Sequence, residues 1–316
     1  MYKKIAILLS LVMVMGLLAA CGNPPVDDSS KDPSTNSSKT LVDELGRTVE
    51  IPENPERVLG LTSAVMEALF NVGITPIGKV EEYKIRDEGI ALESVGMTQT
   101  LNVEKIIELE PDFIIASSRY HASIKDELEL VNCPIYFFDP DATGDISIVD
   151  LTPFVGEMLG RTSARDQYKA DIMALSDDLK NQISEIGGYQ TGMIIKTGDT
   201  ITSAQGSSGY GALLILLGIE NIVPEDLPNA KKSPYVSYDM EQVVKDNPHV
   251  IFVIAPGKDA DANKAILADI KKDDKWSQLD AIKNNKIFMM PFSINPNRMN
   301  VEDMLNGTAK LIIDNK

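Results

Sequence analysis

The sequence of 316 residues contains 47 acidic and 30 basic side chains, which gives a formal net charge of −17 at pH 7. This balance argues against nucleic-acid binding, which relies on clustered Lys and Arg. The length is sufficient for two modest hydrophobic cores.

The amino end predicts a bacterial lipoprotein signal peptide over residues 1–20. Lys3 and Lys4 precede an apolar run at 5–17. This run is too short to span a bilayer, which takes roughly 20 residues, but it has the length of a signal-peptide core. It ends in Leu-Ala-Ala-Cys at 18–21, which resembles a lipobox. We expect the thiol of Cys21 to carry the lipid and to head the mature chain.

Residues 21–40 are rich in Ser, Asn, Asp and Pro and predict a flexible tether. No second long apolar run follows, so we expect the lipid to be the only attachment to the membrane. The remaining cysteine, Cys133, precedes an apolar strand and is expected to be a small buried side chain. A disulfide within one mature chain is therefore not predicted.

Residues 41–144 predict a first α/β lobe. Short apolar strands alternate with helices of about ten residues, a pattern typical of a parallel sheet. A hairpin with Gly46 at its turn opens the lobe. The expected strands lie at 57–62, 75–80, 112–117 and 134–139, and the expected helices at 63–73, 102–111 and 123–132.

Residues 145–187 predict connecting helices. The first ends near Leu159, and the second runs to about Ile186, where Gly187 and Gly188 stop it. The second helix carries one apolar stripe with three-to-four spacing. The stripe consists of Tyr168, Ile172, Leu175, Leu179, Ile183 and Ile186.

The alternating pattern returns at 188–316 and predicts a second α/β lobe. Its expected strands lie at 191–197, 249–256 and 286–292. Its expected helices lie at 209–218, 239–248, 265–272 and 301–314. The expected plan is thus two lobes, each with a mostly parallel central sheet, joined by one long helix.

Four phrases, taken in order, resemble the iron-complex and cobalamin family of ABC transporter substrate-binding proteins. They are residues 43–79, 102–117, 237–253 and 276–288. One departure is Gly-Ile-Glu-Asn at 218–221, where the family usually has Gly-Gly-Glu-Asn. The resemblance implies a rigid helical backbone between the lobes and a ligand cleft between them.

The resemblance also implies a receptor rather than an enzyme. It would be a monomer that hands its ligand to an ABC permease and the ATPase behind it. The expected location is the outer face of the cytoplasmic membrane, of the Gram-positive type. No nucleophile elbow or phosphate loop is present, and no cofactor is expected. A sensory or adhesive lipoprotein on the same fold is the alternative from another class.

Two glutamates match the family's docking positions. Glu104 and Glu241 align with the glutamates that pair with permease arginines, one in each lobe. Exposed charges of this kind fix orientation and speed encounter more than they add affinity.

A ferric siderophore is the favoured ligand. Its iron is already fully ligated, so the protein would supply basic and aromatic groups. Loop residues expected to lie at the cleft ends of strands are the candidates. They are Tyr83, Arg86, Arg119, Tyr120, Tyr210, Tyr235 and Arg298.

Haem and cobalamin remain alternatives. For haem, Tyr120 or His121 could be an axial ligand, with Met97 as a further candidate. The haem-binding branch uses a methionine that falls near Gln99 here and a histidine that falls near Pro256. A metal site built from side chains alone is not expected, because the chain has only two histidines. The single tryptophan, Trp276, is expected to be structural, which disfavours cobalamin.

Overall fold

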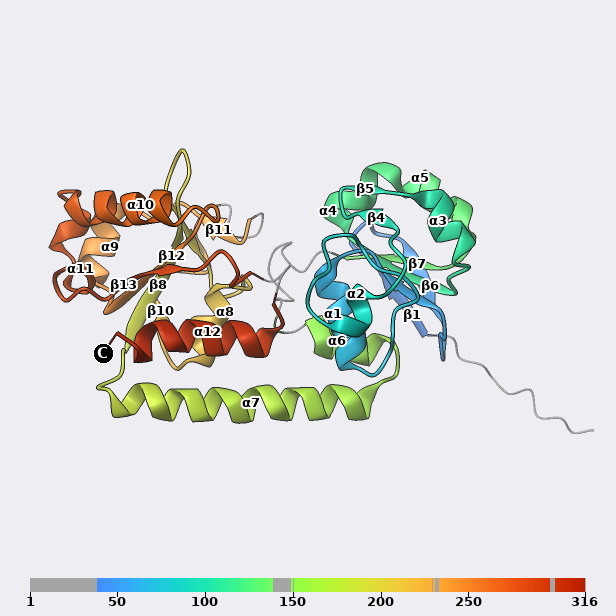
Figure 1. Ribbon diagram of the computed structural model, residues 1–316, viewed down its shortest axis with the longest axis horizontal. Coiled ribbons are helices and arrows are strands. Elements are labelled where there is room, and N and C mark those ends of the chain that lie inside the picture. Colours follow the sequence, from blue (N-terminus) through green and yellow to red (C-terminus); the bar gives the residue numbers. More distant parts are fainter. Residues whose placement is uncertain are drawn as a thin grey trace, which may run out of the picture. The chain divides into compact units, whose positions relative to one another are not determined.

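The computed structural model describes residues 39–138, 149, 151–228, 230, 233–295 and 299–315 (Figure 1). The signal peptide, nearly all of the tether, Cys21 and Arg298 lie outside these residues. Within the described ranges, no helix combines the length and the apolar character that a membrane crossing requires. We call the described part of residues 39–158 the first lobe and the described part of residues 191–313 the second lobe.

The first lobe is built on a three-stranded parallel sheet in the order β3-β6-β7. Its central strand, β6, is fully buried, as the continuous apolar run predicts. Two hairpins, β1-β2 and β4-β5, accompany the sheet. The bounds are β1 Lys39–Val42, β2 Thr48–Ile51, β3 Val58–Gly60, β4 Gly96–Met97, β5 Thr100–Leu101, β6 Phe113–Ala116 and β7 Ile135–Phe137.

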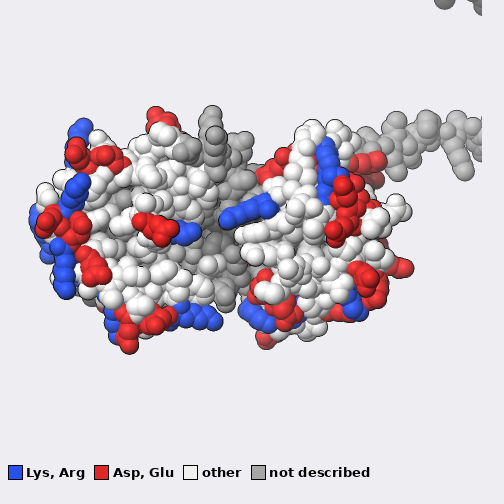
Figure 2. Space-filling model, turned by 90° about the horizontal axis from the view of Figure 1, so that it is seen from above, with Lys and Arg blue, Asp and Glu red and all other residues white. Residues whose placement is uncertain are grey.

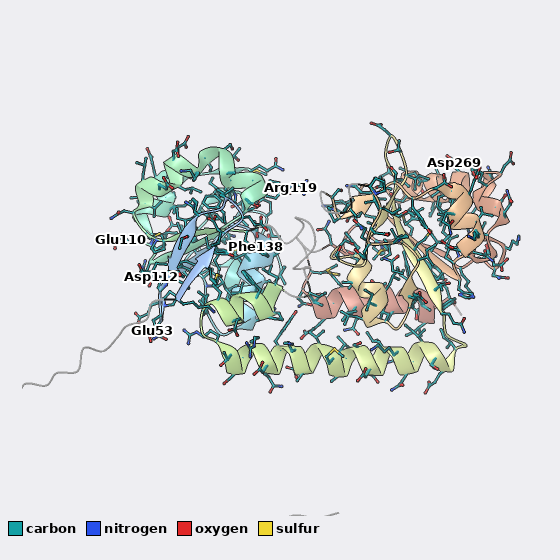
Figure 3. The ribbon with its side chains drawn as sticks, turned by 180° about the vertical axis from the view of Figure 1, so that it is seen from behind. Glu53, Glu110, Asp112, Arg119, Phe138 and Asp269 are labelled. Carbon is teal, nitrogen blue, oxygen red and sulfur yellow. The ribbon has the colours of Figure 1, made fainter. Side chains whose placement is uncertain are left out.

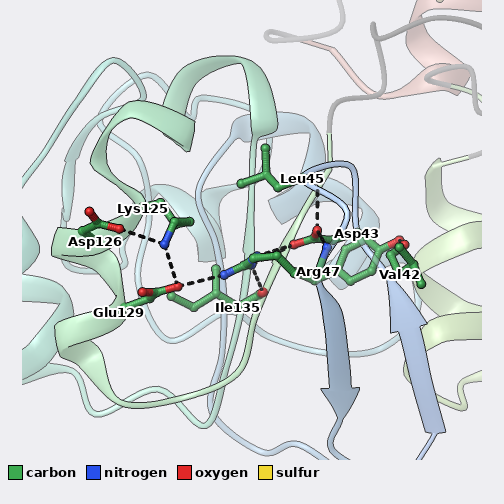
Figure 4. Close-up of polar contacts among 9 residues, drawn as sticks. Val42, Asp43, Leu45, Arg47, Lys125, Asp126, Glu129 and Ile135 are labelled. Atoms are coloured by element: carbon green, nitrogen blue, oxygen red, sulfur yellow. Dashed lines mark hydrogen bonds and ion pairs between the residues drawn. The ribbon is translucent and has the colours of Figure 1, made fainter.

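The predicted opening hairpin is confirmed. Gly46 at its turn has a φ of +75°, a conformation that favours glycine. The neighbouring Asp43 carboxylate accepts hydrogen bonds from the backbone N–H of Leu45 and Arg47 and from the Arg47 guanidinium. That guanidinium also donates to the backbone oxygen of Ile135 and to Glu129, as Figure 4 shows. The arginine thereby fastens the hairpin to the rest of the lobe.

Two predictions for the first lobe are wrong. Residues 75–80 form no strand and contribute only one bridge, between Lys79 and Ser94. The helix expected at 123–132 is broken into the turn η1, the helix α5 and the turn η2, which ends at Asn132 in the left-handed conformation. The helical bounds are α1 Ser63–Asn71, α2 Asp87–Ile90, α3 Val103–Glu108, α4 Ser118–His121, η1 Ala122–Ile124, α5 Lys125–Leu128, η2 Glu129–Val131 and α6 Leu151–Met158.

The second lobe contains a six-stranded mixed sheet. Its main order is β11-β9-β8-β12-β13, with β10 paired to β8. The pairs among β10, β8, β12 and β13 are parallel, whereas β9 and β11 add an antiparallel edge that the sequence pattern did not predict. The bounds are β8 Thr191–Lys196, β9 Thr202–Ala204, β10 Glu220–Asn221, β11 Tyr235–Val236, β12 Val250–Ile254 and β13 Ile287–Met290.

The helices of the second lobe follow the predicted order. Helix α10 begins five residues earlier than expected because Asp259 caps its amino end. The bounds are α8 Gly211–Leu216, α9 Met240–Asp246, α10 Ala260–Lys272, η3 Trp276–Gln278, α11 Asp280–Lys283 and α12 Val301–Ile313. Trp276 is buried in the core with these elements, as expected for a structural tryptophan.

The predicted long helix is present as α7, Thr162–Glu185. It packs against α6 and α1 of the first lobe and against α12 and α8 of the second. Its stripe residues join the apolar core of the second lobe, with Leu175 and Ile186 partly buried and the other four buried. Gly187 and Gly188, both with positive φ, end it as predicted.

Candidate functional site

The two glutamates with predicted docking roles occupy equivalent positions. Glu104 lies in the first turn of α3, where Asn102 caps the helix, and Glu241 lies in the first turn of α9, where Asp239 does so. Both side chains are exposed, and neither takes part in an ion pair between described residues. An acidic side chain in the first turn also suits the partial positive charge of a helix amino end.

The chain after these helices follows one plan in both lobes. Each helix is followed by a residue in the left-handed conformation, Glu110 in the first lobe and Asn247 in the second. A proline comes next, Pro111 or Pro248, and then a buried central strand, β6 or β12. The two units thus share cap, carboxylate, turn and strand in the same order and with the same spacing.

The likeness extends to individual hydrogen bonds. In the first lobe, Asp112 and Arg57 exchange two bonds: the backbone N–H of Asp112 donates to the oxygen of Arg57, and the N–H of Arg57 donates to the Asp112 carboxylate, both at 3.0 Å. His249 and Thr191 repeat this exchange in the second lobe, at 3.0 and 3.2 Å, with the imidazole Nδ1 as acceptor. The start of the central strand is therefore joined to a neighbouring strand in the same way in both lobes.

Arg119 and Tyr120 lie just beyond the carboxyl end of β6, in α4. Figure 3 shows Arg119 and Phe138 at the end of the first lobe opposite Glu110 and Asp112. Arg119 is exposed, with its guanidinium carbon 5.2 Å from the ring centre of Tyr120, and Tyr120 is half-buried. The carboxyl ends of parallel strands are where open α/β sheets bind ligands. This cation and ring therefore offer an anionic ligand both charge and a flat surface.

His121, the next residue, is not available as a haem ligand. It is 1% exposed, and both ring nitrogens are engaged within the protein. Nδ1 accepts from the backbone N–H of Ser117 at 2.9 Å, so Nε2 carries the proton and donates to the oxygen of Thr98 at 2.8 Å. Burial lowers the pKa of His121, which keeps the ring neutral. These hydrogen bonds weigh against the axial-ligand prediction for this residue.

Tyr83 is fully buried, at 0% exposure, and its hydroxyl donates to Glu67 at 2.8 Å. Arg86 donates to the same carboxylate through Nε and Nη2, at 2.8 and 2.6 Å, and its Nη2 also contacts Asn71. Burial raises the pKa of Tyr83, and the Glu67 charge adds to the effect. Tyr83 offers no surface to a ligand, and the Arg86 guanidinium is already paired, so both predicted ligand contacts are replaced by structural roles.

Met97 differs from these residues because it is 52% exposed, in strand β4. Two side chains hold the adjacent turn at Thr98. The Glu82 carboxylate accepts a hydrogen bond from the backbone N–H of Thr98, and His121 donates one to the backbone oxygen of Thr98. The thioether of Met97 thus remains accessible on a held turn.

In the second lobe, Tyr210 and Tyr235 have different surroundings. Tyr210 is buried, and its hydroxyl donates to the oxygen of Ile294 at 2.8 Å. Its ring is part of the core, which weighs against the predicted ligand contact. Tyr235 is half-buried, and Lys196 lies over its ring at 5.1 Å. Lys196 ends β8 and is exposed. Lys196 was not among the residues predicted from the sequence, although a lysine directly after a buried apolar run is a visible signal.

Two further features of the described residues are their potential to hold a metal ion and the distribution of their surface charge. Within them, no group of three or more His, Cys, Asp or Glu side chains is arranged to hold a metal ion. Figure 2 shows acidic and basic side chains in small groups separated by uncharged surface. Cys133 is a half-buried thiol, and burial together with the nearby Asp112 charge raises its pKa to about 11.

Comparisons with known proteins extend over nearly the whole described chain. An Fe(3+)-citrate-binding protein of Bacillus subtilis is 25% identical over 292 residues, which cover 90% of this chain and 89% of the relative. The high-affinity heme uptake protein IsdE of Staphylococcus aureus is 23% identical and covers 76% of this chain and 82% of its own length.

Solved structures share the fold. Staphylococcus aureus SirA complexed with staphyloferrin B has a TM-score of 0.66 at 21% identity, covering 88% of this chain and 97% of that one. The FhuD protein from Staphylococcus pseudintermedius has a TM-score of 0.67 at 19% identity, covering 87% and 98%. The model of the periplasmic binding protein family matches residues 57–294, which include both carboxylate-bearing helices and both central strands. The chain therefore belongs to the periplasmic binding protein family.

Proposed function

We propose that this chain is the extracytoplasmic solute-binding lipoprotein of an ABC importer and that it captures a ferric siderophore or a related ferric complex. The proposal rests mainly on the similarity of 90% of the chain to a ferric-citrate-binding protein. It is supported by the family match at 57–294. The protein would act by binding and handover, without catalysing a reaction.

Arg119 and Lys196 support an anionic ligand. Each is an exposed cation at the carboxyl end of a buried strand, and each lies beside a tyrosine ring. Ferric siderophores with carboxylate or catecholate groups present anionic oxygens around a filled iron coordination sphere. Charge-assisted hydrogen bonds from a guanidinium or an ammonium suit such oxygens, and the rings of Tyr120 and Tyr235 suit flat ligand faces. Arg298, outside the described residues, remains a further candidate.

Docking on the permease is assigned to Glu104 and Glu241. The two carboxylates have equivalent positions on α3 and α9, are exposed, and lack ion-pair partners among the described residues. Two equivalent anionic groups suit a partner that presents a cation to each. Their role is to orient the receptor, because one exposed ion pair contributes only about 0 to 1 kcal/mol.

Haem is the second candidate ligand, and Met97 favours it. Its sulfur is exposed on the β4–β5 hairpin, and Tyr120 supplies a phenol on the same lobe. The engaged nitrogens of His121 weigh against haem, since they remove one predicted ligand. The ferric siderophore therefore stays the favoured ligand.

Direct binding measurements separate these ligands. The mature protein would be dialysed against iron-55 complexes of citrate, a hydroxamate and a catecholate, and titrated separately with haem. We expect saturable binding of at least one siderophore complex or of ferric citrate. A sharp Soret band with haem, together with no retention of any of the three iron complexes, would replace the siderophore assignment by haem. If the protein binds neither haem nor any of the three iron complexes, the proposal that it is an iron-complex receptor is contradicted.

The proposed location depends on Cys21. Replacing it with Ser removes the thiol that accepts the lipid, so labelling with a palmitate analogue should disappear and the precursor should accumulate. Continued labelling of Cys21→Ser in the intact cell would show that the lipid is not attached there.

A further inference from the structure

An apolar feature next to Glu104 extends the docking surface, and this inference rests on the proposed function. Ile107 follows Glu104 by one turn of α3, so the two side chains share one face of the helix. Ile107 is 43% exposed, and Leu130, on the turn η2 against which α3 packs, is 71% exposed. We propose that Ile107 and Leu130 form an apolar contact with the permease beside the carboxylate of Glu104.

Both side chains stand on well-anchored backbone. On α3, Ile106 is fully buried, and Arg57 donates to the backbone oxygens of Leu109 and Glu110 at the carboxyl end. The outward direction of Ile107 is therefore set by the burial of its neighbour.

Leu130 is held in a similar manner. Glu129 binds Arg47 and Lys125, both at 3.1 Å, and Val131 packs against the apolar core. Glu129 and Val131 are thus held by contacts within the protein. Of residues 129–131, Leu130 alone exposes most of an apolar side chain. An exposed apolar group on ordered backbone loses little conformational entropy on binding, which favours it as a contact.

The charges nearby define the partner. Lys105 is engaged by Glu93 at 3.0 Å and by Glu108 at 2.7 Å, whereas Glu104 has no ion-pair partner among the described residues. The free charge beside the apolar pair is therefore negative. The complementary surface is a cation flanked by apolar side chains. The cation would orient the complex, while burial of Ile107 and Leu130 would supply affinity.

The equivalent helix of the second lobe has no such pair. Val244, which corresponds to Ile107, is partly buried against the core of its lobe. Beside α9 lies instead a groove of about 580 Å³, lined in part by Tyr238, Gln242 and Asp246. The two docking helices thus present different chemistry, apolar in the first lobe and polar in the second. We expect the permease contact of the first lobe to contribute more apolar burial.

The test measures affinity between the ligand-loaded, full mature protein and the host's ferric-complex permease–ATPase assemblies in lipid nanodiscs. Variants are Ile107→Ser with Leu130→Ser, Glu104→Arg, and the control Met173→Ser. Met173 is 49% exposed but lies on α7, away from the proposed surface. We expect the double variant to weaken transporter binding on the order of tenfold. Ligand affinity in solution should stay within about twofold.

The outcomes separate the two proposals. Transporter binding of the double variant within about twofold of the control, with Glu104→Arg still impaired, would overturn the apolar contact and leave the docking role of Glu104 intact. If the ligand-loaded wild-type protein binds none of the permease–ATPase assemblies, the proposed importer function is contradicted. Equal losses in the double variant and in Met173→Ser would also overturn the inference, because the effect would not belong to this surface.

Discussion

The two lobes share an architecture but fill their cores differently. The first lobe buries ionisable side chains, namely Asp43, Glu67, Lys79 and His121. In the described part of the second lobe, the buried polar side chains are neutral: Ser203, Gln205, Ser208 and Thr308. A buried charge is tolerated only when it is paired or hydrogen-bonded, so the first lobe depends on specific partners.

Glu67 shows what this dependence involves. Its carboxylate sits in the apolar helix α1 and joins Tyr83 and Arg86, while Asn71 continues the network to Thr152 on α6. Helix α6 in turn packs against α7. This polar network thus joins α1 to α6 within the first lobe, whereas the second lobe meets α7 mainly through apolar packing.

The largest expected effect tests the likeness of the lobes. Reversing both docking charges, in Glu104→Arg with Glu241→Arg, should reduce uptake to background because the permease would meet like charges. Ligand affinity in solution should stay within about twofold. Each single variant should impair uptake if the two helices are equivalent. A collapse of solution affinity would instead place these residues in the ligand pocket.

The next effect tests the difference between the cores. Glu67→Ala leaves Tyr83 and Arg86 without their acceptor, and we expect a loss of about 3 kcal/mol in the free energy of unfolding. Urea denaturation of the purified protein measures it. The exposed Glu104→Ala serves as the control and should change stability by less than about 0.5 kcal/mol. A Glu67 variant as stable as the control would show that the network contributes little.

Ligand contact by the two lobes can be compared directly. Arg119→Ala should weaken ferric-siderophore binding by about one to two orders of magnitude, since a charge-assisted bond contributes roughly 1.5 to 3 kcal/mol. Lys196→Ala should weaken it less, because an ammonium makes no bidentate contact. The control is Arg165→Ala, whose guanidinium pairs with Glu157 and Asp166. Unchanged binding in both Arg119 and Lys196 variants would remove them from the site.

The smallest effect concerns pH. The pKa of His121 is lowered by burial, so the unfolded chain takes up a proton near pH 6.5 that the folded ring does not. Its contribution to stability is therefore complete above pH 6.5 and is lost as pH falls below that value. His121→Asn keeps an acceptor for the Ser117 N–H but does not titrate. We expect the variant to lose less stability between pH 7 and 5.5.

Urea denaturation of both proteins at several pH values between 7 and 5.5 measures the difference in stability. If His121→Asn and the wild type lose stability in parallel as the pH falls, the buried imidazole is not the group responsible.

The sequence alone determined the features that repeat along the chain. We predicted the apolar stripe on α7, the glycine turn at Gly46 and the alternation of strands and helices from the sequence. These predictions were possible because periodicity and turn chemistry are local properties. The positions of Glu104 and Glu241 were predicted from the family resemblance, and the sequence places a cap, the carboxylate and a proline in one order in both lobes.

Tertiary structure decided which polar residues face inward. Tyr83, Arg86 and His121 stand in loops or short helices, where no periodicity sets the direction of a side chain. Their partners, Glu67 and Thr98, lie 16 or more positions away and become visible only when the chain is folded. The short strands β9 and β11 were missed for the same reason: two or three residues carry no pattern, and only pairing with β8 defines them.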